Sequence, residues 1–109
     1  MIAHVAAYNA AAAPEALGRA ARALGGTDAA TALWGLASRL GAPRALSELG
    51  LPKEGLSHAA AMALEGAYWN PRTPDAASLE AMLRCAFDGA APAASFSRSA
   101  APEQLTCPP

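Results

Sequence analysis

The sequence has few charged residues and no bias in their sign. Eight lysine and arginine residues stand against nine aspartate and glutamate residues in a chain of 109, which gives a formal net charge of −1. The charges occur singly rather than in blocks. Proteins that bind nucleic acid or an anionic membrane surface usually carry a basic patch or run. The composition therefore predicts neither nucleic acid nor a membrane as a partner.

Cysteine is scarce, and targeting segments are not evident. Cys85 and Cys107 are the only cysteines, without a CxxC spacing. A secreted chain with little core usually carries more disulfides, so reduced cysteines and a cytoplasmic location are expected. The opening stretch, "MIAHVAAYNAAAAPE", lacks the basic region of a signal peptide, and His4 and Asn9 interrupt its apolar run. No run approaches the roughly 18 apolar residues of a membrane span.

Recognisable catalytic patterns are missing as well. There is no Gly-rich dinucleotide fingerprint, and no serine lies in a nucleophile elbow. The acidic residues occur singly on polar helix faces. His58 has no histidine or carboxylate three or four residues further on, so it does not present a chelating pair. For His4 and His58 a structural or pocket-lining role is expected, and the catalytic residues stay unknown.

Alanine, by contrast, is abundant and dominates a hydrophobic fraction of 53%. Because alanine buries little area, the core of this single domain should be thin. No segment alternates polar and apolar residues with period two, so no strand is expected. Residues 1–89 are predicted to form an all-α bundle of five to six short helices. Residues 90–109, rich in Ala, Pro and Ser, are predicted to form a disordered tail.

Glycines and prolines divide the helical part into segments. Helical patterns cover residues 2–12, 14–26, 27–41, 43–50, 51–68 and 73–89. In the second segment Gly25 and Gly26 are expected to stop the helix, and in the third Thr27 or Asp28 is expected to cap it. In the last, Thr73 is expected as N-cap, with Pro74 at the first helical position and Asp75 in the first turn.

The stretch "AYWNPRTPD", residues 67–75, joins the last two helical segments. Pro71 disfavours helical geometry at Asn70, so the preceding helix must end by Trp69. One interpretation is a simple turn with Tyr68 and Trp69 packed into the junction. The other is the edge of a pocket, where Arg72 meets a carboxylate and the aromatic rings form walls. Both interpretations stay open at this point.

Three elements of the sequence together resemble a known family. These are "HVAAYNAAAAPEALGRAARALGG", then "LWGLASRLGAPRALSELGLPKEGL", and then "YWNPR" followed by a closing helix. In this order and at these spacings, residues 1–90 resemble the C-terminal helical part of the iron-type alcohol dehydrogenase superfamily. Within that superfamily the resemblance is closest to maleylacetate reductases.

The resemblance implies a reductase that transfers hydride from NAD(P)H to maleylacetate, giving 3-oxoadipate in the breakdown of aromatic compounds. Family members carry an N-terminal α/β domain for the dinucleotide, and the metal-dependent ones bind the ion through an aspartate and three histidines. Those elements lie upstream of the matching part, and His4 corresponds to none of these ligands. This chain alone is therefore expected to bind neither cofactor nor metal. The residues expected near a substrate are Tyr68, Trp69, Asn70, Arg72 and His4.

Two hypotheses of different classes follow, with a weaker third. The chain is a part of a reductase, from a truncated gene or a split protein, and inactive unless an N-terminal α/β nucleotide-binding polypeptide joins it. Alternatively, it is a free-standing helical interaction or scaffold module without catalysis. An independent small enzyme is the weakest reading, since no cofactor or metal residues are recognisable. In the first case apolar faces would lack cover, and self-association is expected.

Overall fold

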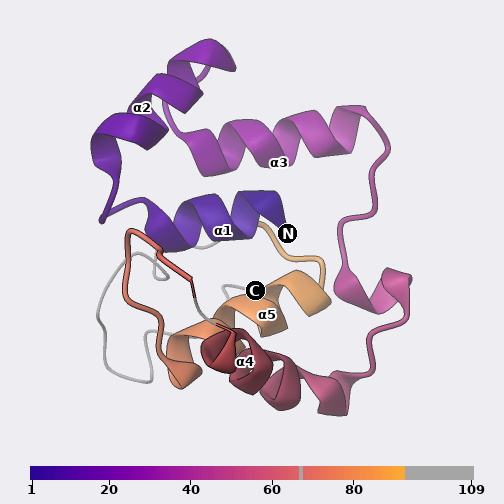
Figure 1. Ribbon diagram of the computed structural model, residues 1–109. Helices are drawn as coiled ribbons and strands as arrows, with labels where there is room; N and C mark the ends of the chain where they lie inside the picture. Colours follow the sequence, from indigo (N-terminus) through magenta and orange to yellow (C-terminus); the bar gives the residue numbers. More distant parts are fainter. Residues whose placement is uncertain (67, 93–109) are drawn as a thin grey trace.

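The computed structural model describes residues 1–66 and 68–92, which fold into five α-helices and two short 3-10 turns (Figure 1). The elements are α1 (Ile2–Asn9), α2 (Pro14–Ala23), α3 (Ala29–Arg39), η1 (Leu46–Leu49), η2 (Lys53–Gly55), α4 (Leu56–Glu65) and α5 (Ala76–Phe87). The described residues contain no strand, and the all-α prediction is confirmed. Most of the predicted tail, residues 93–109, lies outside the described residues, as does Ala67.

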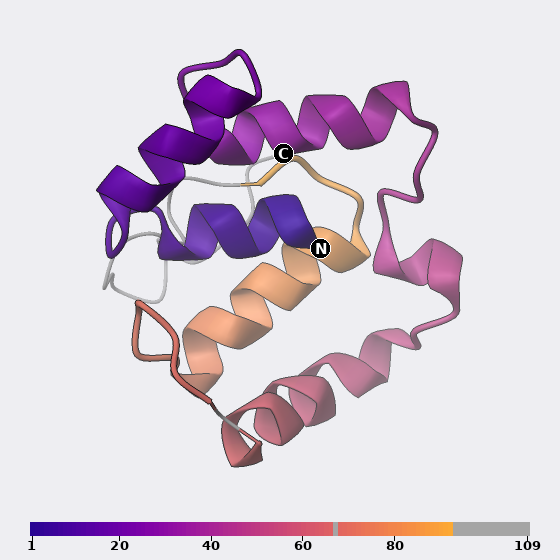
Figure 2. The ribbon, with the colours of Figure 1, turned by 45° about the horizontal axis from the view of Figure 1, so that its top comes forward.

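Helix α1 lies in the middle of the molecule. Helix α3 runs along one side of it and α5 along the other, while α4 packs against α5 and α2 against α3 (Figures 1 and 2). The chain passes from α3 to α4 through η1 and η2, along one side of the bundle. Helices distant in sequence therefore share one core around α1. Among the described residues, no helix is long and apolar enough to cross a membrane.

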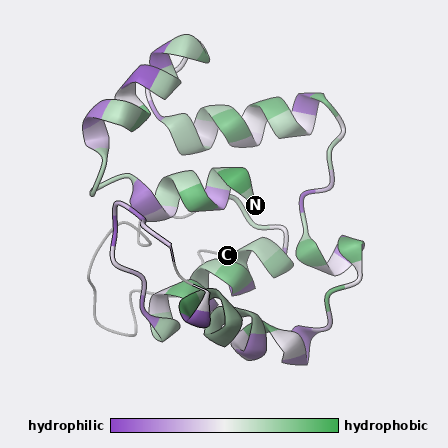
Figure 3. Ribbon diagram, in the orientation of Figure 1, coloured by the Kyte–Doolittle hydropathy of each residue, from purple (hydrophilic) through white to green (hydrophobic). Residues whose placement is uncertain are grey.

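Alanine dominates the core, as its abundance in the sequence predicts. The buried apolar side chains are Ala3, Ala6, Ala7, Tyr8, Ala21, Ala29, Ala30, Leu56, Ala60, Leu79, Met82, Cys85 and Ala86. Figure 3 shows α1 and α5 as mostly hydrophobic, whereas the connector between α4 and α5 is mostly hydrophilic. Small side chains let helices approach closely, because the distance between helix axes depends on the side chains at the contact. They also bury little area each, so polar contacts between helices carry a larger share of the specificity.

Glycine ends three of the helices in the same way. After α5, Gly89 adopts a left-handed conformation with φ 72°, its N–H donates to the carbonyl of Ala86, and the N–H of Ala90 donates to the carbonyl of Cys85. These bonds satisfy carbonyls that the end of a helix leaves unpaired. A Cβ at position 89 would also lie 3.1 Å from the Cβ of Ala45, so both backbone conformation and space favour glycine here. Gly25 and Gly41 end α2 and α3 with the same pair of bonds.

The predicted start of the last helix is wrong by two residues. Asp75, not Thr73, is the N-cap of α5, and its carboxylate accepts the backbone N–H of Ser78 at 2.9 Å. Pro74 therefore precedes the cap instead of occupying the first helical position. Aspartate caps more strongly than threonine, and here Ser78 adds a hydroxyl donor to the same carboxylate at 2.7 Å. At α3 the structure selects Asp28 from the two predicted caps.

The cysteine prediction is tested only at Cys85, because Cys107 lies outside the described residues. Cys85 is completely buried on α5. In the structure its sulfur is part of a disulfide and is not a free thiol. The expectation of reduced cysteines is therefore wrong for this residue.

His4 is a core residue of α1 and joins three parts of the chain. Only 1% of it is exposed, and its Nε2 donates a hydrogen bond to the carbonyl of Ala90 at 2.9 Å. Its ring meets Trp34 of α3 edge-on, with the ring centroids 5.5 Å apart. The Nδ1 atom has no hydrogen-bond partner within the described residues. Burial lowers the pKa of His4 below 6.5, although the bond to Ala90 opposes the shift. This environment favours the structural role expected for His4.

The burial of His4 predicts a pH-dependent stability. The unfolded chain takes up a proton near pH 6.5, whereas the folded chain takes it up only at lower pH. The free energy of unfolding should therefore be highest above pH 6.5 and fall as the pH decreases through 6.5 towards the folded-state pKa. Urea unfolding across this window should show the fall in the wild type and a flat profile in His4→Gln. The exposed His58 gives a matched control, since His58→Gln should keep the wild-type slope. A slope that survives in His4→Gln would contradict this account.

Candidate functional site

The connector between α4 and α5 meets the C-terminal end of α1. There the side-chain amides of Asn9 and Asn70 pair with each other, with N–O distances of 3.1 Å and 2.8 Å. The second Nδ2 hydrogen of Asn70 is donated to the carbonyl of Arg72, which fixes the bend of the connector. Each amide thus donates to and accepts from the other. Sixty-one residues separate the two asparagines in sequence.

Arg72 makes the second contact of this junction. Its guanidinium lies over the ring of Tyr8, 4.0 Å from the ring centroid, and Nη1 donates to the Tyr8 carbonyl at 3.3 Å. That carbonyl belongs to the last turn of α1, where carbonyls lack helical partners and the helix dipole is negative. A cation at this end is favourable on both grounds. We call the pairs Asn9–Asn70 and Tyr8–Arg72 together the α1 clamp.

The hydroxyl of Tyr8 extends the junction to the start of α5. It lies 2.7 Å from Ser78 Oγ, and Ser78 donates in turn to the Asp75 carboxylate at 2.7 Å. Since a carboxylate only accepts, the Tyr8 hydroxyl must be the donor to Ser78. The hydroxyl and the backbone N–H of Ser78 lower the pKa of Asp75 below 3.8, and the charge of Arg72 adds a smaller effect. The chain of bonds therefore ends on a stably ionised carboxylate.

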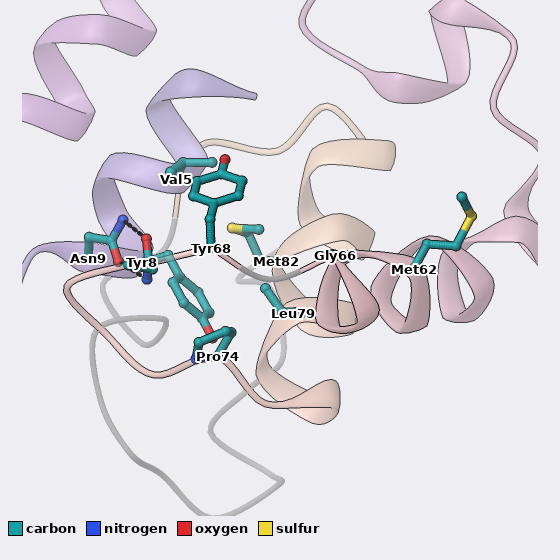
Figure 4. Close-up of a pocket in the computed structure, with 11 residues that line it drawn as sticks. Val5, Tyr8, Asn9, Met62, Gly66, Tyr68, Pro74, Leu79 and Met82 are labelled. Atoms are coloured by element: carbon teal, nitrogen blue, oxygen red, sulfur yellow. Dashed lines mark hydrogen bonds between the residues drawn. The ribbon is translucent and has the colours of Figure 1, made fainter.

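A cavity of about 300 Å³ opens beside the clamp, between α1, the end of α4, the connector and α5 (Figure 4). Its lining residues are Val5, Tyr8, Asn9, Met62, Ala63, Gly66, Tyr68, Asn70, Pro74, Leu79 and Met82. None of them is charged. The apolar walls and the amides of the clamp favour an uncharged occupant. The volume lies at the lower limit of small-molecule pockets, roughly 300–1,000 Å³.

The structure separates the residues that the sequence grouped near a substrate. Tyr68 and Asn70 line the cavity. Arg72 is engaged with Tyr8, and neither it nor Trp69 nor His4 belongs to the lining. The expected packing of the two aromatic rings into the junction is wrong, because Tyr68 is 89% exposed and Trp69 82% exposed. The connector turns at Asn70 and Arg72, and these two residues make its side-chain hydrogen bonds to α1.

Tyr8, Asn9 and Ser78 complete this junction and were not singled out from the sequence. Their partners lie 61 to 70 residues away, so helical periodicity contains no sign of the pairing. One signal was present: "YN" and "NPR" are parts of two of the three elements that carry the family resemblance. In the structure these two elements contact each other.

The described residues do not fit a metal site. Nowhere in residues 1–66 and 68–92 do three or more His, Cys, Asp or Glu side chains gather closely enough to hold an ion. The Nε2 of His4 is already bonded to Ala90, and His58 is exposed. These residues therefore do not supply the ligands for a metal-dependent step.

Comparison with known proteins agrees with the resemblance. Residues 1–87 match the C-terminal part of the Fe-containing alcohol dehydrogenase family. The chain is 47% identical over 89 residues to a maleylacetate reductase of Sphingobium indicum, covering 82% of this chain and 25% of that protein. It is 44% identical over 89 residues to a maleylacetate reductase of Burkholderia cepacia, with the same shares covered.

A solved structure extends the likeness to three dimensions. The crystal structure of a protein described as an alcohol dehydrogenase from Ralstonia eutropha JMP134 superposes with a TM-score of 0.78 at 44% identity. The superposed part covers 84% of this chain and 27% of the chain of that crystal structure. The chain thus spans about a quarter of the length of the relatives that it matches. The fold, the matched residues 1–87 and these identities place the chain in the Fe-containing alcohol dehydrogenase family, as a representative of its C-terminal helical part.

Proposed function

We propose that this chain is the helical C-terminal part of a maleylacetate reductase-like enzyme, which reduces maleylacetate to 3-oxoadipate with NAD(P)H. The observation that carries the proposal is the 47% identity to a maleylacetate reductase over 89 residues. The likeness of fold to a solved family member supports it. The partner that the proposal requires is an N-terminal α/β nucleotide-binding polypeptide, and a cytoplasmic location stays a prediction.

The contribution of the described residues is to position, not to carry out hydride transfer. They contain no strand, and neither a Gly-rich dinucleotide turn nor a metal cluster occurs in the part of the chain that the structure describes. The clamp fixes the end of α1 against the connector, and the Tyr8–Ser78–Asp75 chain fixes both against α5. The result is a rigid, uncharged cavity wall. Such a wall excludes water from whatever it covers.

The proposal predicts activity only in the assembled enzyme. The chain by itself should show no maleylacetate-dependent oxidation of NADH, and calorimetry should detect no tight binding of NADH or a divalent metal. Residues 1–90 grafted onto the preceding part of the Sphingobium maleylacetate reductase should restore turnover. A folded graft without turnover would contradict the proposal. Together with a cooperative, strictly monomeric isolated chain, that outcome would favour a free-standing helical module.

Arg72 allows positioning and substrate contact to be separated. Because its guanidinium stacks on Tyr8 and bonds the α1 carbonyl, Arg72→Ala should lower the free energy of unfolding by about 1 kcal/mol in urea titrations. Arg84→Ala is the matched control. It removes an exposed ion pair with Glu80, which is usually worth about 0–1 kcal/mol, so its effect should be smaller.

The alternative role of Arg72, binding a substrate carboxylate, gives a different result in the grafted enzyme. In that case kcat/KM should fall by about ten-fold or more in both Arg72→Ala and Arg72→Lys, since lysine cannot reproduce the planar fork. The stability of the isolated chain would then be unchanged. A stability loss with nearly wild-type kcat/KM assigns Arg72 to the clamp.

A further inference from the structure

Several large apolar side chains that line the cavity are also exposed. Val5 of α1, Met62 of α4 and Tyr68 of the connector belong to its lining, and they are 39%, 57% and 89% exposed. Figure 4 shows Tyr68 beside Val5, over the cavity floor formed by Leu79 and Met82. We call Val5, Met62 and Tyr68 the cavity rim. Ile2, one turn before Val5 on α1 and 67% exposed, extends the apolar surface along the helix.

The cavity rim is preformed in the chain without a binding partner. Tyr68 lies two residues before Asn70, which is fixed to Asn9 of α1, and Val5 lies on the same helix as Asn9. The clamp therefore sets the spacing between the connector and α1, on which the width of the cavity mouth depends. A preformed concave surface binds with a smaller entropy cost than one that must first be ordered.

The family comparison indicates which partner could bind this surface. In the relatives, the matching helices are joined to the remaining three quarters of one polypeptide, which must pack against some face of them. The rim is concave and uncharged, and it has an aromatic residue of the kind that is enriched in interface hot spots. Of the other strongly exposed apolar residues, Trp69 follows Tyr68 on the connector, whereas Leu40 and Leu49 lie outside the cavity lining and follow the charged residues Arg39 and Glu48 in sequence.

We propose that the cavity rim is the docking surface for the preceding part of the family polypeptide, which inserts apolar side chains into the cavity. The volume of about 300 Å³ suits side chains better than a dinucleotide. The inference rests on the proposed function only for the identity of the partner. Docking requires packing, whereas turnover requires the cofactor and substrate sites as well.

Radical footprinting tests the proposal on the wild-type sequence. The isolated chain and the graft of residues 1–90 onto the preceding part of the Sphingobium reductase are oxidised under identical conditions, and peptides are quantified by mass spectrometry. We expect oxidation of Met62 and Tyr68 to fall several-fold in the graft, with Leu40 and Leu49 unchanged. Protection of Leu40 and Leu49 without protection of the rim would overturn the proposal. Because uncovered apolar faces favour self-association, the isolated chain is oxidised at dilutions where it is monomeric, and rim protection already present in that monomer would overturn the proposal. A graft that dimerises through the rim would assign the surface to a second copy, and would overturn it too.

Paired substitutions give an independent measurement. Met62→Ser with Tyr68→Ser should leave the melting temperature of the isolated chain nearly unchanged, because both side chains are exposed there, but should lower that of the graft. Leu40→Ser with Leu49→Ser is the matched control and should affect neither protein. Equal effects of both pairs in the graft would contradict the proposal. A graft with a protected rim but no turnover rejects the proposed function alone, whereas turnover with an exposed rim rejects the docking surface alone.

Discussion

The α1 clamp is the contact on which the arrangement of the helices depends. Two segments separated by 61 residues meet there through a reciprocal amide pair and through a guanidinium that both stacks on Tyr8 and caps α1. The two amides satisfy each other, so removing one leaves the Oδ1 of the other without its donor in a partly buried place. Such loss costs more than the net value of the bond itself. The clamp therefore specifies how the α4–α5 half lies against α1.

The need for such a contact follows from the composition. A core made mainly of alanines lets helices come close, but it offers few large side chains whose interlocking shapes would select one arrangement over another. Directional polar contacts supply that selection at both ends of α1. At its beginning His4 bonds to Ala90, beyond the end of α5, and meets Trp34 of α3. At its end Tyr8 and Asn9 meet the connector, and the cavity lies beside them.

The sequence predicted what local chemistry determines. The helical segments and the glycine stop after α2 both depend on neighbours within a few residues. The predicted start of α5 was wrong because two capping signals competed, and Asp75 is the stronger cap, which accepts both the backbone N–H and the hydroxyl of Ser78. The exposure of Tyr68 and Trp69 was not predictable, because large aromatic residues are usually covered and their cover depends on non-local packing. The same is true of the pairing of Asn9 with Asn70.

The most direct test of this account is the coupling between the two asparagines of the clamp. Unfolding free energies would be measured in urea for the wild type, Asn9→Ala, Asn70→Ala and the double variant. If the amide pair joins α1 to the connector, each single change removes both bonds between the amides, and the cycle should give a coupling free energy of about 0.5–3 kcal/mol. Effects that add within about 0.3–0.5 kcal/mol would show that the pair does not hold the two segments together, and would contradict the central role of the clamp.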